Sequence, residues 1–283
     1  ALRATLADQL HRKFRLADTL GSALTEGVDG VLLVSEDVEC MSTALMCFAK
    51  ALQDGADYAV CNAVFGFGGA TALYQSRAHL AQNRCALVSR PLLERCRAAA
   101  KDPENVTELL ALAAQFCAHP ARIPQALLHY ERDICAEDAF SATGKRAFLM
   151  SHVLDMTGAP IVLVSAVPVL RSMGYEVVVL GPSDGGALQL FVDAGAAVIT
   201  RPGIRATPNL WGLALCTDLV LVNTVVMART VRALSGTAVP VLWWLHDAFA
   251  GYPHIAHQIP TKLAENVRLY SVGHHAANAM HAV

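Results

Sequence analysis

The stretch Lys145–Pro160, KRAFLMSHVLDMTGAP, decides the fold of the second half of the chain. It begins with a short apolar run typical of a buried strand, continues into a loop that ends at Gly158, and leads into a helix-prone segment. A helix that begins after such a loop presents backbone N–H groups without partners, and its dipole stabilises an anion there. We therefore expect a ligand site at this loop. The alternative is that Gly158 only lets the chain turn and pack closely.

Beyond residue 144 the sequence alternates short apolar runs with helix-prone segments. Continuous apolar strands at this spacing indicate a parallel sheet that is covered on both faces, so we expect an α/β fold with a Rossmann-like parallel sheet and helices on both sides. Pro168 lies inside the first expected helix, where a missing N–H predicts a kink or an early end. The expected strands are 146–151, 176–181, 196–200, 218–223, 239–246 and 267–272.

The first half has a less regular α/β pattern, in which one apolar run, Gly30–Val34, is followed by the carboxylates Glu36 and Asp37. Acidic residues after a buried strand can present a metal or ligand site at a sheet edge, whereas the alternative is an acidic helix start. Further strands are expected at 59–65, 86–89 and 123–130, and helices within 1–28 and at 41–53, 91–100 and 104–116. The polar segment 132–144 is expected to link a first domain, 1–131, to a second domain, 145–283.

The composition excludes several classes of protein. A net charge of −2 without a dense Lys/Arg run gives no indication of the basic surface that binds nucleic acid. Eight cysteines without a C-x-x-C pair predict neither a zinc ribbon nor a redox motif, and they fit a reducing compartment. No apolar stretch is long enough to span a bilayer and no signal peptide is visible, so we expect a cytoplasmic protein, with peripheral association of the full-length protein at the inner face of the membrane.

Five segments of the second half occur in the order that is typical of one family of enzymes. The chain resembles, across residues 145–273, the N-terminal domain of family 4 retaining glycosyltransferases, which have the two-domain GT-B fold. In that family this domain mainly shapes the acceptor pocket, and the C-terminal domain holds most of the sugar nucleotide. The matching segments are 151–160, 170–177, 181–185, 218–224 and 241–247.

The resemblance implies a set of site residues. It places Thr157, Gly158 and Ala159, together with Asn223, near the phosphates of a nucleotide-sugar donor, and it places His246 near the reacting sugar as the catalytic residue. No metal or other cofactor is implied for this part. A histidine at a strand end can bond a sugar hydroxyl or stabilise a developing phosphate charge, whereas the alternative is a core histidine whose hydrogen bonds are satisfied.

The first half is similar to the later portion of family 2 glycosyltransferases, which have the GT-A fold. This resemblance implies that Asp37 and Glu36 belong to a degenerate metal-binding Asp-x-Asp motif for Mn²⁺ or Mg²⁺. Ser35 takes the place of the first aspartate of that motif. Asn105 stands where the family has its general base, and an amide cannot accept the proton. We therefore expect an incomplete and degenerate GT-A-like portion before the GT-B domain.

The function that these resemblances imply is transfer of a hexose from a nucleotide-sugar donor to a glycan or lipid-linked acceptor during surface polysaccharide synthesis. The chain starts at Ala1 and ends inside an expected helix, so we expect a fragment that is inactive alone because the C-terminal domain is missing. The alternative is a non-catalytic module that binds glycan or serves as a scaffold. A Rossmann oxidoreductase is disfavoured because no G-x-G-x-x-G follows any expected strand.

Overall fold

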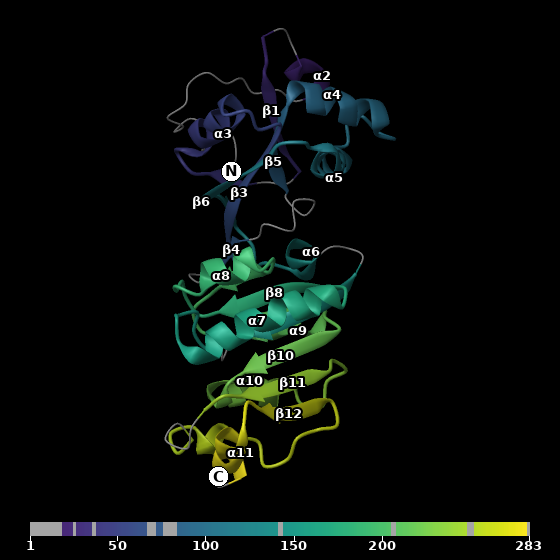
Figure 1. Ribbon diagram of the computed structural model, residues 1–283. Coiled ribbons are helices and arrows are strands. Elements are labelled where there is room, and N and C mark those ends of the chain that lie inside the picture. The colour runs from purple at the N-terminus through teal and green to yellow at the C-terminus, as the bar shows by residue number, and fades with distance from the viewer. Residues whose placement is uncertain are drawn as a thin grey trace. The chain divides into compact units, whose positions relative to one another are not determined.

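The computed structural model describes residues 19–24, 27–35, 38–66, 72–75, 84–140, 144–204, 208–247 and 252–281. The chain divides into two compact units (Figure 1). The first unit consists of Ala1–Gly69 and His79–Asp133, and the second consists of Ala70–Ala78 and Ile134–Val283.

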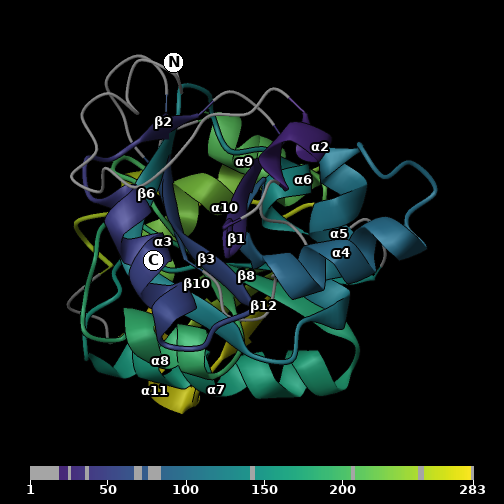
Figure 2. The same cartoon turned by 90° about the horizontal axis from the view of Figure 1, so that it is seen from above.

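The first unit is a mixed sheet with helices on both of its faces. Its strands run in the order β1-β5-β3-β6-β2, and only the β3–β6 pair is parallel. Helix α3 lies on one side of this sheet, and α4 and α5 lie on the other (Figures 1 and 2). The elements are β1 (Gly30–Val34), β2 (Glu39–Cys40), β3 (Tyr58–Phe65), β5 (Cys85–Ser89), β6 (Pro120–Tyr130), α2 (Leu20–Ala23), α3 (Ala44–Gln53), α4 (Arg90–Ala99) and α5 (Val106–Phe116).

The segment expected as a linker contains structure that belongs to the second unit. A short helix, α6 (Ala136–Ala139), starts at Cys135, whose backbone N–H donates to a carboxylate oxygen of Asp138 at 2.9 Å. Phe140 follows the helix, is buried, and packs edge-on against Phe148 with 6.4 Å between the ring centroids. The end of the expected linker is therefore attached to the core of the second unit.

The second unit is built on six parallel strands in the order β9-β8-β7-β10-β11-β12. This order is that of a Rossmann fold, and it confirms the α/β fold class. One further strand, β4 (Ala72–Gln75), pairs antiparallel with β9. The parallel strands are β7 (Lys145–Met150), β8 (Tyr175–Gly181), β9 (Ala197–Thr200), β10 (Leu219–Asn223), β11 (Val241–Leu245) and β12 (Val267–Ser271).

Helices cover both faces of this sheet, as the apolar strands require. Helices α7 and α8 lie on one side, and α9 and α10 lie on the other (Figure 2). The helical elements are α7 (Gly158–Ser172), α8 (Leu188–Asp193), α9 (Pro208–Leu215), η2 (Val225–Met227), α10 (Ala228–Leu234), η4 (Ala256–Gln258) and α11 (His274–His281).

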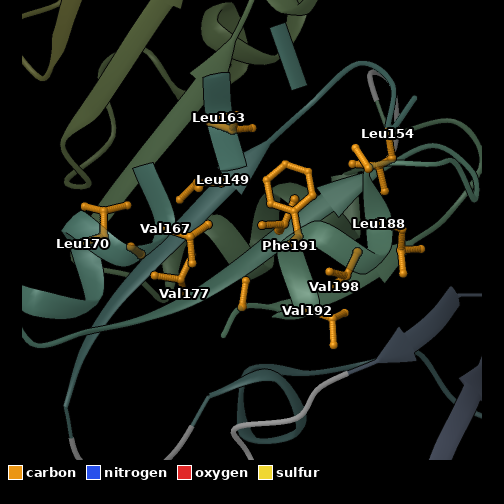
Figure 3. Close-up of a cluster of buried hydrophobic side chains, with 14 of the residues drawn as sticks. Leu149, Leu154, Leu163, Val167, Leu170, Val177, Leu188, Phe191, Val192 and Val198 are labelled. Atoms are coloured by element: carbon orange, nitrogen blue, oxygen red, sulfur yellow. The ribbon is translucent and has the colours of Figure 1, made fainter. Parts of the chain in front are cut away.

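The core under α7 and α8 is a continuous cluster of aliphatic side chains around one phenylalanine (Figure 3). Phe191 of α8 is fully buried and lies among side chains of α7 and of the strands. Successive residues of β7, such as Phe148 and Leu149, are both fully buried, because neighbouring side chains of a strand point to opposite faces of the sheet. Burial on both faces explains the continuous apolar run 147–150 in this strand.

Helix α7 does not end early at Pro168, so that part of the prediction is wrong. The helix continues to Ser172, four residues beyond the proline. Pro168 lies on the exposed side, whereas Leu163, Val167 and Leu170 are buried against the sheet. The packing of this buried stripe holds the helix together despite the missing backbone hydrogen bond.

Within the described ranges, no helix is both long and apolar enough to cross a bilayer.

Replacing Phe191 by Ala should destabilise the second unit by about 3–5 kcal/mol, because it removes a large side chain and leaves a cavity. The matched control is Leu190→Ala at the neighbouring position, which is 37% exposed and should cost less than about 1 kcal/mol. All three tryptophans, Trp211, Trp243 and Trp244, belong to this unit, so their fluorescence during urea unfolding reports its stability. If Phe191→Ala and Leu190→Ala lowered the free energy of unfolding by the same amount, the assignment of Phe191 to the core would be contradicted.

Candidate active site

The candidate site lies at the carboxyl edge of the parallel sheet, where three neighbouring strands end. Strand β7 lies beside β10, and β10 lies beside β11. The chain leaves β7 into α7 on one side of the sheet and leaves β10 into α10 on the other (Figure 2). In open α/β sheets, ligands bind outside the carboxyl ends of the strands at the point where this change of side occurs. The structure thus brings the ends of β7, β10 and β11 to one edge.

The loop between β7 and α7 forms an open helix start. Thr157 is the N-cap of α7, but its side chain makes no capping bond; its hydroxyl and its N–H both donate to the Asp155 carboxylate. The N–H groups of Gly158 and Ala159 have no acceptor among the described residues. Pro160 has no N–H to offer, so the first turn presents two donors where a helix start usually presents more.

Gly158 is not required by the backbone of this turn. Its φ is not in the left-handed region, and a Cβ built on it meets no atom within 4 Å. The close packing is instead between this loop and the one that follows β8: a Cβ on Gly185 would lie 2.3 Å from the carbonyl oxygen of Leu154. Close packing therefore explains a glycine at 185 and does not explain the one at 158.

A carboxylate lies beside the helix start. Hydrogen bonds from Thr157 lower the pKa of Asp155, which is fully exposed, so its negative charge is kept at neutral pH. A carboxylate near a helix N-terminus already complements the dipole. A phosphate placed at Gly158 would be repelled by the nearby negative charge of Asp155. An uncharged hydroxyl would not be repelled.

Asn223, the last residue of β10, connects this strand to the first turn of α7. Its amide nitrogen donates to the carbonyl oxygen of Ala159 at 3.1 Å, and the residue is fully buried. The other atom of the amide, Oδ1, is buried and has no partner among the described residues. The structure therefore brings together the predicted residues Asn223 and Ala159, with Asn223 below the surface of the site.

His246 follows β11 and is half-buried. Its ring lies 4.9 Å from the ring of Trp244, measured between centroids, and its Nε2 is buried without a partner among the described residues. Burial lowers the pKa of His246 below 6.5, and the nearby His152 lowers it further, whereas Asp247 raises it. The lowered pKa thus favours the neutral imidazole at pH 7, and Nε2 is open for a hydrogen bond.

Three residues at the same edge were not assigned a role from the sequence. His152 follows β7, Thr224 follows β10, and Asp247 follows His246. The Thr224 hydroxyl lies 3.2 Å from Nδ1 of His152, and the Asp247 carboxylate accepts the N–H of Val225 at 2.7 Å. Their signal in the sequence is their position directly after buried strands that become neighbours in the sheet.

The predicted metal site of the first unit lies outside the described residues, because it consists of Glu36 and Asp37. In the part of the chain that the structure describes, no group of three His, Cys, Asp or Glu side chains is placed to hold a metal ion. The neighbouring Ser35 donates its hydroxyl to the Arg84 carbonyl at 3.0 Å. Asn105 caps α5 by accepting the N–H of Glu108 at 3.0 Å, so a structural role explains it.

The first unit also contains an open groove of about 940 Å³ between α3 and the start of β6. None of the residues predicted as a site from the sequence lines it. Two basic side chains along it are engaged within the unit: Lys50 pairs with Asp54, and Arg122 donates to the side chain of Asn62.

The pKa of His246 should lie below 6.5 in an NMR titration of its ring protons. Because the folded-state pKa is depressed, the unfolded chain binds more protons between that pKa and 6.5. The stability contribution of His246 is therefore fully present above pH 6.5 and is lost as the pH falls through the folded-state pKa. His246→Asn should remove this part of the pH dependence of unfolding. A measured pKa at or above 6.5 would be inconsistent with the buried, unpartnered ring.

Residues 143–279 match the model of the family described as Glycosyl-transferase family 4. No curated protein and no solved structure matches the chain. The match confirms the resemblance of the second half to family 4 and supports a glycosyltransferase activity in general terms. The resemblance of residues 1–131 to the GT-A glycosyltransferases is not supported by these comparisons. The part of the chain at 143–279, which includes every residue of the candidate site, is thus similar to family 4 of the glycosyl-transferases.

Proposed function

We propose that the second unit takes part in the transfer of a hexose from a nucleotide-sugar donor to a glycan or lipid-linked acceptor in the synthesis of surface polysaccharide. Two findings support this proposal: the family match over residues 143–279, and the polar groups gathered at the carboxyl edge.

The observation that carries the proposal is the open Nε2 of His246. A buried polar atom without a partner costs free energy, so it is commonly found where a ligand completes the hydrogen bond. The lowered pKa favours the neutral imidazole, which can exchange a hydrogen bond with an uncharged hydroxyl of the sugar. In this proposal His246 touches the transferred sugar close to the reacting carbon.

The start of α7 supplies the second contact. The N–H groups of Gly158 and Ala159 point out of an open helix start and can donate to an oxygen of the donor, either on the sugar or on the nearer phosphate. Thr157 holds the turn through Asp155, and Asn223 fixes Ala159 from below. Only glycine at 158 leaves the backbone fully accessible to the ligand.

The test is an NMR titration of the chain with UDP-glucose, with GDP-mannose as a second nucleotide sugar and UDP as the ligand without a sugar. We expect saturable shifts at Gly158, Ala159 and His246. His246→Ala should weaken binding of the nucleotide sugar about 3- to 10-fold, which corresponds to one lost hydrogen bond, and should leave UDP binding unchanged. Gly158→Ala should weaken binding of the nucleotide sugar without lowering the thermal midpoint, because its Cβ meets open space within the protein, and UDP binding should weaken as well only if the contact is to the phosphate.

The control variant is His281→Ala, an exposed histidine at the last position of α11. It should bind all three ligands as the wild type does. The proposal fails if the shifts are confined to the first unit, or if His246→Ala binds both nucleotide sugars as tightly as His281→Ala.

A further inference from the structure

Thr224 has a backbone conformation that glycine normally occupies. With φ 73° and ψ 161°, it has the one positive φ among the non-glycine residues that the structure describes. This region of φ and ψ is disfavoured for every side chain and most strongly for a β-branched one such as threonine. Such a conformation persists only where the surrounding structure holds it in place.

Three hydrogen bonds from the neighbouring strand β11 and its end hold the backbone on both sides of Thr224. The Thr224 N–H donates to the carbonyl oxygen of Trp244 at 2.8 Å, and the indole N–H of Trp243 donates to the carbonyl oxygen of Thr224 at 2.8 Å. The next N–H, that of Val225, donates to the carboxylate of Asp247 at 2.7 Å. Asp247 is thus the one side-chain anion in this set, and a bond to a charged acceptor is a strong one.

The consequence of this conformation is the direction of the Thr224 hydroxyl. It lies 3.2 Å from Nδ1 of His152 at the end of β7, and Thr224 is only 1% exposed. A hydrogen bond at one ring nitrogen fixes the orientation and the tautomer of an imidazole. Thr224 follows β10, the strand between β7 and β11. It therefore connects Asp247, which follows β11, to His152, which follows β7.

Asp247 also acts on the second imidazole of the site. Among the described residues, the titratable groups whose charges affect His246 are Asp247, beside it in the chain, and His152, after β7. The negative charge of Asp247 opposes the effect of burial and of His152 on His246. One carboxylate is therefore placed to influence both histidines, one through the backbone and the other through its charge.

We propose that Asp247 and Thr224 are positioning residues of the site: Asp247 holds the Thr224–Val225 peptide in place, and the Thr224 hydroxyl then sets the orientation of His152. This inference rests on the proposed function, because it concerns how the sugar-binding edge is kept in order. Neither residue needs to touch the ligand. Both act through the two imidazoles, and the strain at Thr224 is what makes the hydroxyl reach His152.

Two pairs of variants separate this role from a general contribution to folding. Thr224→Val keeps the shape and removes the hydroxyl, whereas Thr224→Ser keeps the hydroxyl. Asp247→Ala removes the acceptor of the Val225 N–H, whereas Asp247→Asn keeps an acceptor oxygen and removes the charge. In each pair one member retains the hydrogen bond that the proposal requires.

The readout is the long-range ¹H–¹⁵N spectrum of the histidine rings at pH 7.5, which reports the tautomer and hydrogen bonding of each imidazole. Thr224→Val and Asp247→Ala should both change the ring ¹⁵N shifts of His152, although the Asp247 carboxylate acts on the N–H of Val225 and the Thr224 hydroxyl is the group beside that ring. Thr224→Ser and Asp247→Asn should leave these shifts as in the wild type. Asp247→Asn should instead lower the pKa of His246, because the favourable negative charge is lost.

The inference is overturned if Asp247→Ala folds and leaves the His152 shifts unchanged, or if Asp247→Asn changes them as much as Asp247→Ala does. Should Asp247→Ala fail to fold, the Thr224 pair decides: equal His152 spectra for Val and Ser at this position would overturn the proposal.

A titration with UDP-glucose distinguishes failure of this inference from failure of the proposed function. Thr224→Val should bind the ligand at least threefold more weakly than Thr224→Ser does, at an unchanged thermal midpoint. Equal affinity of these two variants would count against a positioning role for the hydroxyl. If the wild type binds neither UDP-glucose nor GDP-mannose, the nucleotide-sugar contact on which the proposed function rests is overturned, and the ring spectra still decide whether Thr224 and Asp247 position His152.

Discussion

Burial of the parallel strands β9, β8, β7, β10 and β11 between two layers of helices is the constraint on which the second unit depends. A parallel strand between two layers of helices has no polar side to offer, so every side chain along it must find an apolar neighbour. Phe191 and the aliphatic residues around it satisfy this requirement on one face, and the helices after β9 and β10 cover the other. Polar residues can occur just after the carboxyl ends of the strands, because these positions do not lie between the two layers of helices. The candidate site lies there.

The polar groups at this edge are linked by hydrogen bonds that connect the three strand ends. Asn223 fastens the start of α7, Thr224 contacts His152, and Asp247 holds the peptide after Thr224. The three strand ends are thereby connected in the order in which the strands lie in the sheet. His246 differs from Thr224 and Asp247 because its Nε2, like the Oδ1 of Asn223, is buried and has no partner among the described residues. A site in which most groups are already satisfied presents few hydrogen-bonding atoms, and those few then determine which ligand group fits.

Much of the second unit could be predicted from the sequence because its signals are local. Each of the six strands was expected as an apolar run, and each is found within two residues of its expected bounds. The sequence also placed His246 and Asn223 at strand ends, which is where the structure has them. The conformation of Thr224 was not predictable, because threonine is among the residues least suited to it and the groups that hold it come from another strand. Strand β4 was missed because Ala72–Gln75 is short and its partner, β9, is more than a hundred residues away in the sequence.

Strand β4 belongs to the second unit although it lies far from the rest of that unit in the sequence. The family match begins at residue 143, yet the outermost strand on the β9 side of the second unit comes from Ala72–Gln75. The chain therefore enters the second unit, returns to the first, and enters the second again at Ile134. A polypeptide cut at the start of the family match would contain the complete parallel sheet but would leave the hydrogen-bonding edge of β9 bare, and bare edges of this kind promote association between copies. The boundaries of the family match and those of the compact second unit are therefore different.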